Sequence, residues 1–144
     1  MSQNEKYSIF AMRIALGWIF LYAGVTKIFN PEWSAAGYLK IAKSFPSLFI
    51  WLSNSSNIGW VNFLNEWGLT FIGIGLIVGL FVKYASYGGI LLMVLYYFPI
   101  LQFPKVGNNG FIIDEHIIYI IIFSLLIASN AGIFCGVDGK ITKK

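Results

Sequence analysis

Five ionisable residues stand at the ends of long apolar runs in this chain of 144 residues: Lys27, Glu66, Asp114, Glu115 and His116. A charged side chain near the hydrocarbon core of a bilayer is costly, so it is usually paired, directed into a helix bundle, or retained for function. If the chain crosses a bilayer four times, all five residues fall on the same side of it. A histidine beside carboxylates can accept and pass on a proton near neutral pH. The sequence therefore predicts one polar site in an otherwise apolar protein.

The composition favours a membrane protein, because 58% of the residues are hydrophobic and only 11% are charged. A soluble domain cannot bury that much apolar surface. The apolar runs cover residues 7–28, 60–82, 84–101 and 112–134, and a spanning helix needs about 20 residues. We therefore expect an all-α integral membrane protein, a four-transmembrane-helix bundle that forms a single domain over residues 1–144.

The long connection between the first two runs, residues 29–59, is rich in aromatic residues and is divided by Pro31 and Pro46. Such a segment is typical of the membrane interface, and we expect two short helices within it. A loop is expected before the last run, where turn-forming residues gather: Pro104, Gly107, Asn108, Asn109 and Gly110.

The distribution of basic residues predicts the orientation. With an even number of spans, both termini lie on one side, and the bias in lysine and arginine favours the cytoplasmic side for them. The closing lysines, Lys140, Lys143 and Lys144, are expected to anchor the chain near anionic lipid heads. The basic residues are otherwise scattered, which argues against nucleic-acid binding. We expect a multi-pass protein of the cell membrane, in contact with the lipid bilayer.

The counts of cysteine and histidine limit the redox chemistry of the chain itself. Cys135 is the one cysteine and His116 the one histidine. A Cys-x-x-Cys redox pair, paired-histidine haem ligation and an iron–sulfur cluster are therefore excluded within this chain, and no metal site is predicted. Any electron carrier must be held in another way or by a partner.

The first apolar run carries a stripe of charged and small residues. At about 100° per residue, Arg13, Gly17, Phe20, Gly24 and Lys27 fall on one narrow face. This pattern predicts the face turned toward other helices. Alternatively, the two cations extend to the two membrane interfaces.

The second apolar run has two different faces. Glu66 and Thr70 share one face with Gly73, whereas Gly75 and Gly79 lie on the opposite face and predict a close helix contact. Glu66 is interpreted either as a proton-exchanging carboxylate or as the partner of the lysine in the first run.

The last apolar run opens with Asp114, Glu115 and His116. The acids suit the first turn of a helix, where they cap free N–H groups and complement the helix dipole. The face that begins at His116 continues to Asn130, and it points inward if Asn130 is buried. His116 is interpreted either as a relay or ligand contact or as an ordinary interfacial histidine.

The order of these motifs resembles the DoxX/DoxD family. The resemblance rests on Arg13 with the run 16–20, on Gly24, Lys27 and Pro31, on Glu66 with Gly68 and the run 75–81, on the run 113–116, and on the closing run 136–138. It implies a four-helix membrane protein in a quinone-linked context. Named members include the small membrane subunit of an archaeal thiosulfate:quinone oxidoreductase.

This resemblance leads to the first functional hypothesis, a membrane subunit of a quinone-linked oxidoreductase within a hetero-oligomer. Other membrane or outer-side redox subunits are its expected partners, and a quinone is the expected cofactor. Glu66, His116 and Asp114 are the candidates for proton exchange. The candidates for holding the quinone are Lys27, Glu115, Arg13 and Tyr97, with Tyr96 as the alternative to Tyr97.

Two other functions remain open. In the first, the chain is a non-catalytic structural subunit of a larger membrane complex, and its charges are ion pairs that fix helix register. In the second, the chain is a small transporter or channel, with Arg13, Lys27, Glu66 and His116 along its path.

Overall fold

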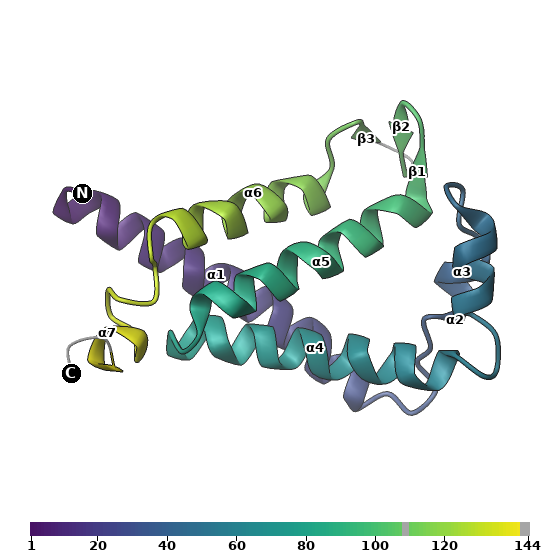
Figure 1. Cartoon of the computed structure of the whole chain (residues 1–144), viewed down its shortest axis with the longest axis horizontal. Helices are drawn as coiled ribbons and strands as arrows, with labels where there is room; N and C mark the ends of the chain where they lie inside the picture. Colours follow the sequence, from purple (N-terminus) through teal and green to yellow (C-terminus); the bar gives the residue numbers. More distant parts are fainter. Residues whose placement is uncertain (108–109, 142–144) are drawn as a thin grey trace.

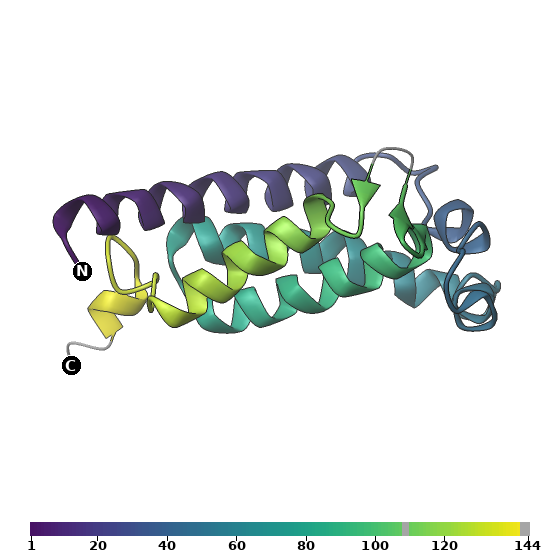
Figure 2. The ribbon, with the colours of Figure 1, turned by 90° about the horizontal axis from the view of Figure 1, so that it is seen from above.

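Four long helices run along the long axis of the molecule (Figures 1 and 2). The computed structural model describes residues 1–107 and 110–141. The long helices are α1 (Gln3–Ile28), α4 (Ile58–Val78), α5 (Val82–Ile100) and α6 (Glu115–Ala128). Ser2 and Glu5 form a capping box that fixes the start of α1, in which each side chain accepts from the other residue's backbone N–H.

Among the described helices, α1 and α4 are long and apolar enough to cross a membrane. At a rise of about 1.5 Å per residue, the 14 residues of α6 extend over only about 21 Å, less than the roughly 30 Å hydrocarbon core. Two of the four predicted spans thus meet the criterion of length and hydropathy. The four-span bundle stays a prediction.

The expected last span, 112–134, is wrong at both ends. Asp114 caps the first turn of α6, and the helix ends at Ala128. Asn130 then adopts a left-handed conformation with φ 48°, which a helix cannot continue through. Asn130 is exposed and lies beyond the helix, so the inward face predicted from His116 stops before Asn130, although Phe123 on that face is completely buried.

The closest helix contact joins α1 to α4, and it uses the face of α4 that was not expected to pack. Gly24 lies so near α4 that a Cβ there would be 2.8 Å from the Glu66 carbonyl oxygen and 2.6 Å from the Thr70 nitrogen. Gly73 meets the backbone of Leu21 in the same way. Gly79 instead ends α4 at φ 73°, where a residue with a Cβ is strained. The face with Glu66 thus packs against α1, while Gly75, on the predicted packing face, approaches Ala85 of α5.

The connection between α1 and α4 holds two short helices, as predicted: α2 (Ala36–Lys40) and α3 (Pro46–Leu52). They share a small core of their own, which includes Leu39 and Phe49. In Figure 1 they stand across one end of the long helices, beside the last turn of α5.

The expected loop before α6 is folded into a small three-stranded antiparallel sheet, a departure from the purely helical expectation. Its strands are β1 (Leu101–Gln102), β2 (Lys105–Val106) and β3 (Gly110–Phe111). Leu101 pairs with Val106, and Val106 pairs with Gly110. Two residues of the predicted loop, Asn108 and Asn109, lie outside the described residues.

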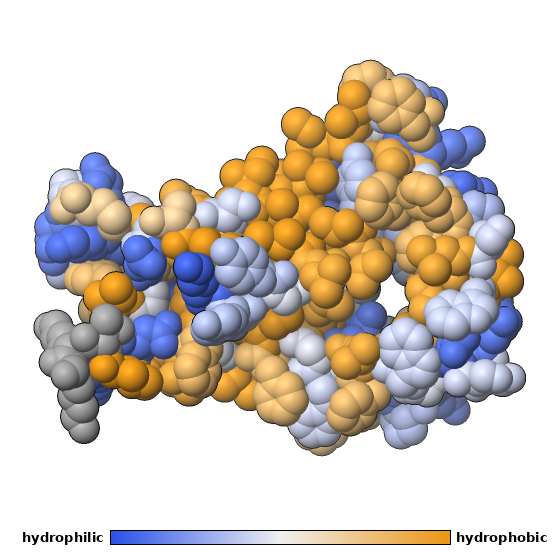
Figure 3. Space-filling view, viewed as in Figure 1, coloured by the Kyte–Doolittle hydropathy of each residue, from blue (hydrophilic) through white to orange (hydrophobic). Residues whose placement is uncertain are grey.

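The two ends of the molecule differ from its middle. The space-filling view shows apolar surface over the middle of the long helices and polar surface gathered toward both ends (Figure 3). The start of α1 and the last helix, α7 (Asp138–Ile141), lie at the same end (Figure 1). Two residues of the expected basic anchor, Lys143 and Lys144, lie outside the described residues.

Candidate functional site

One pocket, here termed the lysine–histidine pocket, brings together residues from α1, α4, α5, α6 and the segment at α2. It has a volume of about 400 Å³. The pocket is lined by Lys27, Trp33, Ser34, Ala35, Tyr38, Asn65, Tyr96, Ile100, Glu115 and His116.

Lys27 brings a positive charge to this pocket without a direct ionic partner. Its Nζ donates to the Ala23 carbonyl at 3.1 Å and lies 5.3 Å from the centre of the Trp33 ring. No carboxylate lies within 4.0 Å of Nζ in the described part of the chain, so the alternative of a Glu66–Lys27 ion pair is not met there. Glu66 acts on the lysine only through its field. The ammonium group keeps N–H donors that a ligand can use.

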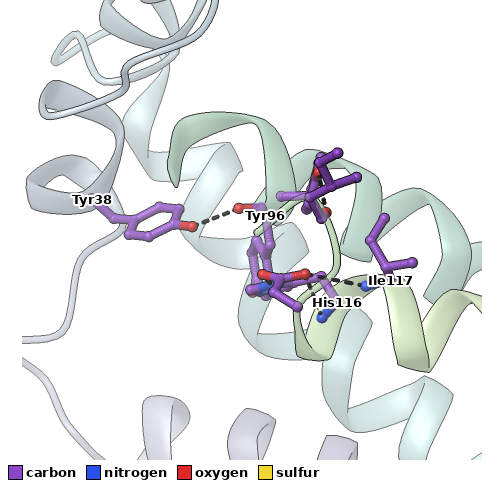
Figure 4. A network of polar contacts seen from close by, with 7 residues as sticks. Tyr38, Tyr96, His116 and Ile117 are labelled. Atoms are coloured by element: carbon purple, nitrogen blue, oxygen red, sulfur yellow. Dashed lines mark hydrogen bonds and ion pairs between the residues drawn. The ribbon is translucent and has the colours of Figure 1, made fainter. Parts of the chain in front are cut away.

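His116 and Asp114 form the closest charged contact of the site, with Nδ1 2.6 Å from a carboxylate oxygen. The other oxygen of Asp114 accepts from the backbone N–H groups of His116 and Ile117, as the helix cap (Figure 4). With the carboxylate ionised, Nδ1 carries a proton that it donates to Asp114. This contact fixes the orientation of the imidazole and leaves Nε2 as the nitrogen that can exchange a proton with a ligand.

Two tyrosines and an asparagine connect the walls of the pocket. The Tyr38 hydroxyl donates to the Tyr96 carbonyl at 2.6 Å, as Figure 4 shows, and the Tyr96 hydroxyl donates to the side-chain oxygen of Asn65. Burial raises the pKa of Tyr38 to about 12, and the nearby charges of Asp114 and Glu115 add to that rise. Tyr38 is therefore a protonated donor at neutral pH.

The structure brings together three of the seven predicted site residues. Lys27, Glu115 and His116 line the lysine–histidine pocket, and Asp114 stands behind His116 as its partner. Glu66 is half-buried on α4 and does not line the pocket.

Of the two tyrosine candidates, Tyr96 rather than Tyr97 reaches the pocket. Tyr97 turns away, and its hydroxyl donates to the Ile112 carbonyl at 2.6 Å, in the segment just before α6. The two residues are adjacent, and a step of about 100° on the helix separates their directions.

Arg13 lies at the opposite end of the bundle, where its role is structural. Its side chain is completely buried and does not extend to an interface. Its guanidinium donates to the backbone carbonyls of Ala131, Phe134 and Cys135, at 2.7, 3.2 and 2.9 Å. Asp138, from the same closing segment, caps the start of α5 by accepting from the backbone N–H groups of residues 81 and 82. These bonds tie the chain after α6 to α1 and α5.

Six of the ten lining residues were not site candidates in the sequence, among them Trp33, Tyr38 and Asn65. Trp33 and Tyr38 lie in a connection whose course a periodic pattern does not indicate. Asn65 had a signal, since it is an amide within an apolar run and adjoins Glu66. It is 8% exposed and accepts from Tyr96.

A family model described as DoxX matches residues 8–100 of the chain, which confirms the resemblance seen in the motifs. The matched segment runs from α1 to the end of α5, so it includes Lys27, Asn65 and Tyr96, whereas Asp114 and His116 follow it. No curated protein and no solved structure matches the chain. The match and the apolar helices α1 and α4 together indicate a location in a membrane.

Proposed function

The chain belongs to the DoxX family of membrane proteins, and from that premise we propose that it is a membrane subunit of a quinone-linked oxidoreductase. The lysine–histidine pocket is the proposed quinone site. The observation that carries this proposal is the convergence of Lys27, His116 and Tyr96 on one pocket of about 400 Å³.

The residues of the pocket fit a flat ring with polar atoms on its edge. Small-molecule sites have volumes of about 300–1,000 Å³ and combine apolar and aromatic walls with a few polar groups. Trp33, Tyr38 and Tyr96 supply the aromatic walls, and Lys27 and His116 supply polar groups from two different helices. A ring between these helices can therefore meet hydrogen-bonding groups on two of its edges.

Each polar side chain has a distinct part in the proposal. A bound quinone supplies two-electron chemistry, in which it takes up two protons as it becomes a quinol. Lys27 donates to a ring oxygen and stabilises negative charge there. His116 exchanges a proton through Nε2, and Asp114 holds the imidazole in the orientation that this exchange requires.

The electron donor is assigned to a partner subunit. With one histidine and one cysteine, this chain has neither the ligands for a paired-histidine haem nor the thiolates for an iron–sulfur cluster. Its role in the complex is to bind the quinone ring and to exchange protons with it.

A quinone titration of the purified protein in lipid nanodiscs tests the proposal. Binding of a short-chain quinone is followed by the quenching of Trp33 fluorescence, in a background in which the other four tryptophans are replaced by phenylalanine. Lys27→Met and His116→Gln are each expected to weaken binding at least about tenfold, since hydrogen bonds to charged groups contribute about 1.5–3 kcal/mol. Glu66→Gln is expected to have a smaller effect, because Glu66 acts on Lys27 only through its field.

Lys83→Met is the matched control for the titration, because Lys83 is exposed and lies near Asp138 at the other end of the bundle. Its binding should equal that of the wild type. Equal binding by the wild type, Lys27→Met and His116→Gln would remove the proposed site.

The structural-subunit alternative is favoured by one observation at the end opposite the pocket. There the side chains of Arg13 and Asp138 form the hydrogen bonds to backbone groups described above. At that end, charged residues of the family motif therefore stabilise the fold. This alternative predicts co-purification with other subunits and no quinone binding by the wild type in the titration.

A further inference from the structure

A second pocket adjoins the lysine–histidine pocket and has a different character. It has a volume of about 220 Å³ and shares Lys27, Tyr96, Glu115 and His116 with the first pocket. We term it the apolar arm. Its remaining walls are apolar or aromatic: Ile19, Phe20, Ala23, Leu69, Met93 and Tyr119.

The apolar arm lies where α1 and α6 approach one another. α1 packs along α4 and α6 packs along α5, whereas α1 and α6 touch at few points. Figures 1 and 2 show that these two helices cross at an angle and do not run side by side. Phe20 closes one part of the seam, with its ring centre 6.2 Å from Tyr119 and 5.1 Å from Phe123.

The wall of the arm reaches the lateral surface of the molecule. Ile19 is 43% exposed, and it belongs to α1, one of the two helices that are long and apolar enough to cross a membrane. The arm therefore connects the polar groups of the first pocket with a surface that is suited to lipid chains.

We propose that the ligand of these joined pockets is an amphiphile, whose polar ring lies at Lys27 and His116 and whose apolar tail leaves between α1 and α6 into the lipid. This inference rests on the proposed function and adds the route that the tail of a lipid-soluble quinone takes, between α1 and α6. The first pocket accepts the ring, and the apolar arm accepts only the first part of the tail.

The arm provides a path for the tail, but it adds little to the binding affinity. Lipid chains are as apolar as the walls of the arm, so moving a tail from lipid into the arm gains little. A bulky side chain placed in the arm should therefore act by steric exclusion of the tail, and it should leave a ring without a tail unaffected.

The test compares a tetramethylbenzoquinone, which has no tail, with a decyl-substituted benzoquinone, both titrated in the same nanodiscs. Ala23→Phe fills the arm, and Ile19→Trp narrows it from the lipid side. Ala15→Phe is the matched control, since Ala15 is exposed on the same helix and lines neither pocket. Because partition into the lipid is the same for every variant, each ligand is compared between variant and wild type.

We expect Ala23→Phe and Ile19→Trp to weaken binding of the decyl quinone about tenfold or more. Their binding of the ring without a tail should match the wild type, as should both ligands with Ala15→Phe. If Ala23→Phe does not fold, the result for Ile19→Trp decides.

The failure of this inference and the failure of the proposed function have different signatures. Unchanged binding of the decyl quinone in both arm variants overturns the tail route, even when Lys27→Met still weakens ring binding. If instead the affinity for the ring is the same in Lys27→Met, His116→Gln and the wild type, the quinone site as a whole is overturned.

Discussion

At the scale of single residues, the charged side chains divide into two groups by what they contact. Lys27 and His116 line a pocket with polar atoms, whereas the guanidinium of Arg13 donates hydrogen bonds to backbone carbonyls. A buried cation that donates to three backbone carbonyls, as Arg13 does, stabilises the structure. A cation beside a pocket whose N–H groups are not all used, as in Lys27, can bind a ligand. The contacts therefore separate function from structure where residue type does not.

The Asp114–His116 contact gives a prediction that distinguishes the role of Asp114 as a helix cap from its role in orienting the imidazole. Asparagine caps a helix about as well as aspartate, but it lacks the charge that orders the imidazole. Asp114→Asn should leave the thermal unfolding midpoint nearly unchanged and weaken quinone-ring binding several-fold. Asp114→Ala should weaken binding and also lose about 1 kcal/mol of stability. Equal binding by Asp114→Asn and the wild type would show that the carboxylate serves only as a cap.

Replacing Arg13 should reveal its structural part. Arg13→Met removes donors from three carbonyls and should lower the free energy of unfolding by about 2–4 kcal/mol. Lys83→Met, at an exposed position, should stay within about 0.5 kcal/mol of the wild type. Thermal unfolding in detergent measures both. A stable Arg13→Met protein that has lost quinone binding would contradict this assignment.

At the scale of elements, α1 and α4 form the rigid pair on which the site is built. Their glycines bring the two backbones into close contact, and this contact sets Lys27 on α1 against Asn65 on α4 across the pocket. α2 completes the wall from outside the bundle through Tyr38. The position of the pocket thus depends on the tight helix crossing and on the contacts that dock the segment at α2, among them the Tyr38 bond and the bond from the Ala35 N–H to the Asn62 side chain.

A methyl group at the crossing should force α1 away from α4. Gly24→Ala places a Cβ 2.6 Å from the Thr70 nitrogen and should destabilise the fold by about 1–3 kcal/mol. Gly59→Ala is the control on α4, because nothing lies within 4 Å of the added carbon. It should be neutral or slightly stabilising, since alanine favours a helix. Thermal unfolding compares the two variants, and an equal effect of both would argue against the tight crossing.

The docking of α2 should depend on alkaline pH through Tyr38. Because burial raises the pKa of Tyr38 to about 12 from an ordinary value of 10, the unfolded chain loses this proton first as the pH rises. The stabilisation is complete below pH 10 and is lost as the pH approaches 12. The wild type should lose more stability than Tyr38→Phe across this window. Parallel unfolding curves for the two proteins would contradict the buried, protonated state of Tyr38.

At the scale of the whole molecule, the two polar ends have different roles. The end with α2 and α3 carries the lysine–histidine pocket, and the end with α7 carries the bonds of Arg13 and Asp138 that hold the chain ends together. Apolar side chains fill the core between them, among them Leu16, Phe20, Leu69 and Leu76.

The sequence predicted the helical class, the family and the gathering of Lys27, Glu115 and His116. Charges at the ends of apolar runs mark one level of a bundle, and this signal is local. It did not predict that Tyr96 and not Tyr97 reaches the pocket, because the rotation of a helix with few polar residues is set by tertiary packing. Nor did it predict the end of α6, where the Arg13 guanidinium binds the carbonyls of the following segment. Such long-range contacts leave no periodic pattern.

Photoaffinity labelling with an azido-benzoquinone, mapped by mass spectrometry, is the most direct test of the central claim. The proposal predicts labelled peptides within residues 27–38, 93–100 and 115–119, with labelling lost in Lys27→Met and retained in Lys83→Met. Labelling of the exposed aromatic face of α4, formed by Phe63, Trp67 and Phe71, that is unchanged in Lys27→Met would contradict it. That result would show that the quinone contacts the protein only non-specifically, from the surrounding lipid.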